Sequence, residues 1–213
     1  MIGFRARKSV YSSVVTALLV STGNPAAAKE TLVELARRLA PMPILIERQR
    51  ELVSSPFEPL VAEADLIVHA TVTPIRTYLS ADQREVFTDY AVSPIRMLFK
   101  RNVDASATPG VVASIVMTAW GGRMTVEGVE VVLRDRNAPQ LGDRVEAALF
   151  LKEDAPGRYR LVSDVTGALG VTAGRIRFLN ADEAYDERFK SIRDSTIDQV
   201  QREVERLKGR PVR

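Results

Sequence analysis

ADLIVHATVTPIRTYLSADQREVFTDYAVSPIRMLF, residues 64–99, contains two long runs of alternating side chains separated by a polar turn. In the first run, apolar residues occupy every second position: Leu66, Val68, Ala70 and Val72. The positions between them hold polar residues: His69, Thr71 and Thr73. A period of two is typical of a strand with one buried face, so this run predicts a half-buried β-strand.

The second run is interrupted by a proline. It opens with β-branched and aromatic residues on one face: Val86, Thr88, Tyr90 and Val92. After Pro94, the apolar residues fall on positions of the opposite parity. Because proline cannot donate to a sheet ladder, Pro94 in this run and Pro74 in the first indicate a sheet edge or a β-bulge. Bulged strands let small closed barrels turn their corners.

Further stretches have the pattern of strands: residues 111–119, 124–133, 145–151 and 159–178. Tight turns are indicated at Glu127-Gly128, Pro156-Gly157 and Ala173-Gly174. Residues 145–151 are apolar on both sides at their centre, which predicts an inner strand. A chain with about six short strands at this spacing is typical of an all-β barrel or sandwich.

Composition restricts the chemistry that is available. The 213 residues include no cysteine and one histidine, which excludes disulfides, thiolate nucleophiles and multi-histidine metal sites. We expect no cofactor and no metal. The formal net charge is +3, with 30 basic and 27 acidic residues. Residues 1–28 hold three of the basic residues and no acid, so 27 basic residues remain beside the 27 acids. The excess positive charge therefore belongs to the first segment.

That first segment has the features of a secretory signal peptide. A basic opening, MIGFRARK, precedes a short apolar stretch around residues 14–20 and the small residues Ala26-Ala27-Ala28. The apolar stretch is shorter than the roughly 20 residues that cross a bilayer. We expect residues 1–28 to be cleaved and the protein to be periplasmic or secreted. An uncleaved membrane anchor and an ordinary N-terminal helix are the alternatives.

Helices are predicted on both sides of the β-rich region at residues 57–179. Residues 29–56 are interpreted as a helical lead-in, because apolar residues recur at helical spacing before Pro41. Residues 180–213 predict a long amphipathic C-terminal helix of about 28 residues, opening with an N-cap at Asn180 and Glu183. Its apolar stripe either packs on the barrel or supports self-association, and its spacing is broken between Ile192 and Ile197.

The strand pattern resembles a bacterial exported domain of unknown function with an OB-like barrel. It is distantly similar to the netrin-type module of tissue inhibitors of metalloproteinases over about residues 60–178. The residues that carry the resemblance are Ala64–Val68, Tyr90–Val92, Leu98–Lys100, Gly142-Asp143 with Leu149–Leu151, and Tyr159 with Gly167. The resemblance implies a small five-stranded barrel. Those inhibitors chelate the protease metal through an N-terminal cysteine, which this chain lacks, so inhibition is not implied.

Individual residues give little support to catalysis. His69 lies away from the apolar face of its strand and has no partner motif, so we interpret it as structural. The carboxylate pairs Glu63 with Asp65 and Asp82 with Glu85 are explained by solvation and turn formation. Gly121-Gly122 lacks the framework of a nucleotide-binding loop and predicts a bulge.

The leading hypothesis is a non-enzymatic binding module for a protein or envelope ligand, with Trp120, Tyr90 and Tyr78 on its contact surface. A cytoplasmic OB-fold that binds single-stranded nucleic acid is the alternative, since arginines and aromatics accompany the strands. Acidic residues are interleaved with these arginines, which makes nucleic acid the less favoured partner. A third hypothesis is a hydrolase that uses Glu63 and Asp65.

Overall fold

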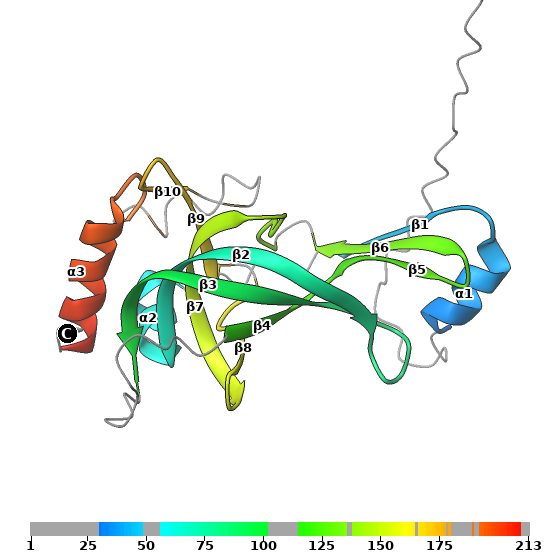
Figure 1. Ribbon diagram of the computed structural model, residues 1–213, viewed down its shortest axis with the longest axis horizontal. Coiled ribbons are helices and arrows are strands. Elements are labelled where there is room, and N and C mark those ends of the chain that lie inside the picture. The colour runs from blue at the N-terminus through cyan, green and yellow to red at the C-terminus, as the bar shows by residue number, and fades with distance from the viewer. Residues whose placement is uncertain are drawn as a thin grey trace, which may run out of the picture.

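The computed structural model describes residues 30–48, 56–101, 115–135, 138–164, 166–177, 179, 189 and 192–209. The predicted signal peptide and the predicted N-cap at Asn180 lie outside these residues. Figure 1 shows a barrel with α2 and α3 at one end of the molecule and a second, smaller sheet with α1 at the other. In chain order the elements are α1 (Leu32–Leu39), β1 (Ile44–Arg48), α2 (Phe57–Glu63), β2 (Leu66–Leu79), β3 (Val86–Lys100), β4 (Ile115–Trp120), β5 (Gly122–Val126), β6 (Val129–Asp135), β7 (Val145–Ala155), β8 (Arg158–Leu161), β9 (Ala168–Thr172), β10 (Arg175–Arg177) and α3 (Ile197–Lys208).

Five strands close into a barrel. The sheet runs β7-β2-β3-β4-β8, and β8 pairs with β7 to complete the ring. All of these pairings are antiparallel except that of β4 with β8, which is parallel. This closed, mainly antiparallel arrangement is that of an OB-like barrel, so the predicted fold class is confirmed. β9 and β10 extend the sheet from β7.

The long β2–β3 hairpin bends at bulges, as its prolines predicted. The register shifts between Pro74 and Arg76, and again opposite His69 and Ala70, where Ile95 is the extra residue. A further shift opposite Ile67 and Val68 leaves Leu98 as the extra residue. Each bulge adds twist and changes which positions face the barrel interior.

Two apolar clusters lie on opposite sides of the barrel wall. The interior is filled by alternate residues of β2, β3, β4 and β7, among them Val68, Tyr90, Met117 and Leu149. The outer side of β2 and β7 is covered by α2 and α3, where Ile67 and Phe150 meet Leu60 and Val200. β7 is therefore buried on both sides, as its sequence predicted.

The C-terminal helix is much shorter than predicted. α3 has 12 residues and begins after Thr196, whose side chain accepts a hydrogen bond from Gln199 N in a capping box. Ile192 is buried in the same cluster but lies in a turn, so one helix of about 28 residues is wrong. The break in the apolar spacing between Ile192 and Ile197 marks the start of α3. Ile197, Val200 and Val204 are buried against the barrel and α2.

The second sheet has the order β1-β6-β5 and is covered by α1. β1 pairs in parallel with β6, so the segment from Ile44, which we had interpreted as part of a helical lead-in, is a strand. The hairpin at Glu127-Gly128 forms as predicted, but it belongs to this sheet and not to the barrel wall. Both turn residues have positive φ angles, 49° and 78°, as in a type I′ turn. None of the helices that the structure describes is long and apolar enough to span a membrane.

Candidate binding face

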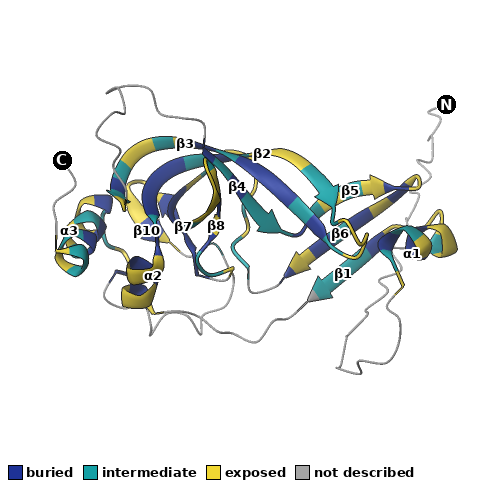
Figure 2. Ribbon diagram, turned by 90° about the horizontal axis from the view of Figure 1, so that it is seen from below, coloured by how far each residue is buried: buried dark blue, intermediate teal, exposed yellow. Residues whose placement is uncertain are grey.

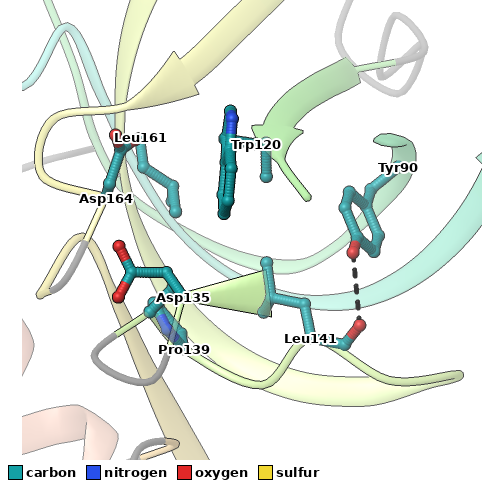
Figure 3. A pocket seen from close by; sticks show the side chains of 9 residues that line it. Tyr90, Trp120, Asp135, Pro139, Leu141, Leu161 and Asp164 are labelled. Atoms are coloured by element: carbon teal, nitrogen blue, oxygen red, sulfur yellow. Dashed lines mark hydrogen bonds between the residues drawn. The ribbon is translucent and has the colours of Figure 1, made fainter. Parts of the chain in front are cut away.

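Two of the predicted contact residues lie together, but in a cavity. Tyr90 points into the barrel and is 8% exposed, and its hydroxyl donates to the Leu141 carbonyl at 3.3 Å. The Trp120 ring stands beside it, with Asp135 and Leu161 on the other side (Figure 3). The cavity measures about 40 Å³, which is room for about three water molecules. It is too small to hold a chain-like ligand.

Tyr78 belongs to a different surface, on the outside of the barrel. We define the outer face by the outward-facing side chains of four neighbouring strands: Arg76 and Tyr78 of β2, Phe87, Asp89 and Ala91 of β3, Val116 and Thr118 of β4, and Arg158 and Arg160 of β8. In β3, β4 and β8 the intervening residues Tyr90, Met117 and Tyr159 fill the barrel interior, so alternation places Asp89, Thr118 and Arg158 outside. Arg76 and Tyr78 bond to Asp89, and the Phe87 ring lies beside Tyr78, so they belong to the same face. The three predicted aromatics therefore do not share one surface.

Asp89 lies at the centre of the outer face and is only 2% exposed. Its carboxylate accepts hydrogen bonds from Thr118 Oγ1 at 2.7 Å, Arg76 Nε at 2.8 Å and Tyr78 Oη at 3.2 Å. Burial raises the pKa of Asp89, but these hydrogen bonds and the charge of Arg76 outweigh burial and hold the pKa below its usual value. Side chains from β2 and β4 are thus fixed around one ionised carboxylate of β3.

The arginines of the outer face exceed its carboxylates. Arg158 Nη1 lies 3.9 Å from Asp89 Oδ2, which is too long for a hydrogen bond. Among the described residues, no hydrogen bond of the Arg158 guanidinium is found, and its side chain is 52% exposed. Arg160 pairs instead with Asp154 at 2.9 Å. Because Arg76 and Arg158 share Asp89, one positive charge at the centre of the face is uncompensated.

Aromatic rings lie beside these charges. The rings of Tyr78 and Phe87 have centroids 6.1 Å apart, and the Arg76 guanidinium carbon lies 5.0 Å from the Tyr78 centroid. Sequence reasoning found Tyr78 but missed Asp89. The alternation had placed Thr88 and Tyr90 on one face of the strand. Asp89 lies between them in the sequence, so it could have been predicted to lie on the opposite face.

The candidate acids and the histidine have structural contacts. His69 is buried, and its Nε2 lies 2.7 Å from Glu146 Oε1. Asp65 Oδ1 pairs with Arg101 at 2.7 Å and Asp65 Oδ2 accepts from the Glu153 amide, while Glu63 is exposed at the end of α2. The Asp82 carboxylate accepts from Ser80 Oγ and from the Arg84 amide in the hairpin turn. No group of three potential metal ligands occurs within the described ranges.

A second, open groove of about 430 Å³ is lined by Lys100, Arg101, Lys152 and Tyr159. Its cations are largely engaged with the C-terminal end of α2. Arg101 and Lys208 donate to the Ala62 carbonyl, and Lys152 lies 3.5 Å from the Glu63 carbonyl. Cations at this end of a helix satisfy its last carbonyls and its dipole, so we assign them a structural role.

The class that fold and site define is therefore a small OB-like barrel with an open sheet face carrying arginines and aromatic rings. Comparison with known proteins gives no match to a family model, a curated protein or a solved structure.

Proposed function

We propose that this protein is a non-enzymatic binding module whose ligand lies across the outer face of β3 and β4. The observation that carries the proposal is the Asp89 cluster. A carboxylate buried on an otherwise open sheet face holds Arg76 and Tyr78 in fixed positions, so they need not be ordered when a ligand binds. The nearby Arg158 adds donors that Asp89 does not use.

The fold supports the same location. In OB-folds, chain-like ligands lie on the face of the second and third barrel strands, beside the loop that joins the fourth and fifth. Here those strands are β3 and β4, and the loop is the turn at Pro156-Gly157. Fold alone does not identify a ligand, so the side chains of the outer face carry the rest of the argument.

Solution NMR tests this location with three defined probes: an acidic peptide, a chito-oligosaccharide and a (dT)12 oligonucleotide. We expect at least one probe to shift the amide resonances of Tyr78, Phe87 and Thr118. The double variant Arg76→Ala/Arg158→Ala should lose these shifts. The control Arg123→Ala removes an exposed arginine of the second sheet and should keep them. Shifts that avoid β3 and β4 with every probe would contradict the proposal.

We further propose that the protein is exported. The support is the basic, then apolar, then alanine-rich order of residues 1–28. The intact mass of the protein from fractionated cells tests this. A species beginning near Lys29 in the exported fraction is expected, whereas full-length protein confined to the cytoplasm would contradict export.

Single-stranded nucleic acid is the second candidate ligand, favoured by the combination of Tyr78, Phe87 and exposed arginines. Against it, Asp89 occupies the centre of the face, and Asp154 neutralises Arg160. Binding of (dT)12 to the outer face that weakens steeply with added salt would favour this alternative.

A further inference from the structure

Two isoleucines are exposed on the same hairpin. Ile75 is 56% exposed and Ile95 57% exposed; the other large apolar side chain exposed in the described part of the chain is Met42. Each isoleucine is the extra residue of a β-bulge, and each stands in the sequence Pro-Ile-Arg. Figure 2 shows the exposed stretches on β2 and β3 that contain them. Each of the two bulges thus exposes one isoleucine side chain to solvent.

Small side chains lie between the two isoleucines. In the ladder, Thr71 pairs with Ser93 and Thr73 with Ala91, and these residues continue the outer face toward Ile95. The flanking pairs, Ala70 with Pro94 and Pro74 with Tyr90, are four positions apart. Each isoleucine lies about half a step outside these pairs, so at about 3.3 Å per residue the two are separated by about five positions, or about 16 Å, along the strands. Because the side chains between Ile75 and Ile95 are small, another polypeptide chain can lie on the surface between the two isoleucines.

The surroundings of this surface are basic. Arg76 and Arg96 directly follow the two isoleucines, and Arg158 lies on the strand beside Val116. Arg76 is bound to Asp89 and Arg96 to Asp198 of α3. Arg158 has no such hydrogen bond among the described residues, so it has donors free to form a bidentate pair with an incoming carboxylate.

We infer that the outer face binds an acidic, extended polypeptide segment. Two of its apolar side chains, four to six residues apart, contact Ile75 and Ile95, since five residues of extended chain span about 16 Å. A carboxylate of the segment pairs with Arg158. This inference rests on the proposed function and names the ligand class of the same face.

A displayed library of random 12-residue peptides tests the inference. Selection on the wild-type protein, with removal of peptides that also bind Ile75→Ser/Ile95→Ser, should enrich sequences with Asp or Glu and with two apolar residues four to six positions apart. The selected peptides should bind about tenfold more weakly to Ile75→Ser, to Ile95→Ser and to Arg158→Gln, as measured by fluorescence polarisation. Met42→Ser, which removes an exposed apolar side chain elsewhere, should leave binding unchanged.

The outcomes separate this inference from the proposed function. Peptides that depend on Ile75 and Ile95 but are neutral or basic, or that bind Arg158→Gln normally, would overturn the acidic ligand and leave a binding face. Displacement of the peptides by (dT)12 would make nucleic acid the occupant. If no peptide depends on these residues and no NMR probe shifts the outer face, both proposals fail. Arg158 lies outside the two bulges that hold the isoleucines, so Arg158→Gln keeps the test decisive if a serine variant unfolds.

Discussion

At the scale of the residue, Asp89 links stability to the candidate site. Asp89→Asn removes the charge that Arg76, Thr118 and Tyr78 surround, so we expect the free energy of unfolding at pH 7 to fall by about 2 kcal/mol. The pKa of Asp89 is lower in the folded protein than in the unfolded chain. Its stabilisation is therefore complete above the unfolded pKa and is lost as the pH falls through the folded pKa.

Urea unfolding at pH 7 and at pH 3 measures this effect. The difference between wild type and Asp89→Asn should be large at pH 7 and shrink at pH 3. Asp82→Asn is the exposed control. The Ser80 hydroxyl and the Arg84 amide lower the pKa of Asp82 as well, but solvent screens this turn and the loss should be much smaller. A difference for Asp89→Asn that is the same at both pH values would contradict the assignment.

Gly122 is a second residue whose identity the fold requires. It has a φ angle of 142°, and a Cβ atom there would lie 2.2 Å from Thr88 Oγ1. Gly128 also has a positive φ, but nothing lies within 4 Å of its added Cβ. Gly122→Ala should therefore cost about 3 kcal/mol in unfolding free energy and Gly128→Ala about 1 kcal/mol. Thermal unfolding of the two variants provides the comparison, and equal losses would refute the steric explanation.

At the residue scale, some features of the site could have been predicted from the sequence and others could not. Alternation had placed Tyr90 on the same face as Val86 and Val92, and those residues are buried, so its burial could have been predicted. The meeting of Arg76 with Asp89 could not, because the bulge at Ile75 changes the parity of β2 and the sequence does not state the register.

At the scale of the element, α3 is held to the barrel by its last turn. Lys208 Nζ donates to the carbonyls of Ala62 and Ala64 and lies 4.4 Å from the centroid of Phe99. Burial, followed by the charge of Arg101, lowers the pKa of Lys208. Lys208→Met should reduce the free energy of unfolding by about 1 kcal/mol through the lost hydrogen bonds and cation–π contact.

Arg202→Met is the matched control for this change, because Arg202 is an exposed cation on the same helix. Urea unfolding of both variants measures the difference, and an equal effect would show that helix charge, not the contact with α2, is responsible. The N-terminal cap of α3 was not recognised from the sequence. The Thr196 capping box was overlooked because the apolar stripe from Tyr185 to Leu207 was interpreted as one continuous helix.

At the scale of the whole molecule, short-range patterns predicted the strands and turns of the barrel. They did not predict which strands pair with one another or to which sheet each strand belongs. The alternation in β2, β3 and β7 and the glycine turns are local signals. The parallel pairings β4 with β8 and β1 with β6 join segments far apart in the sequence, and no local pattern encodes them. The hairpin of β5 and β6 was consequently assigned to the barrel region.

The separate cores give the last prediction. Ile44 is 2% exposed and packs in the cluster of the second sheet with α1, Val131 and Leu133, apart from the barrel interior. The β2–β3 hairpin reaches this cluster only at its tip, through Leu79 and Val86. Ile44→Ala leaves a cavity there and should cost about 3 kcal/mol locally. Because few apolar contacts connect the two cores, the second sheet should open without the barrel.

Hydrogen exchange read by mass spectrometry follows this opening segment by segment. In Ile44→Ala, peptides covering β1 and β6 should exchange much faster than in wild type, while those covering β2 from Leu66 to Val72 and the centre of β7 keep their protection. A core variant of the barrel, Leu149→Ala, should accelerate exchange in β2 and β7. If Ile44→Ala accelerated exchange equally in both sheets, the molecule would unfold as one cooperative unit, and the outer face could not stay intact while the second sheet opens.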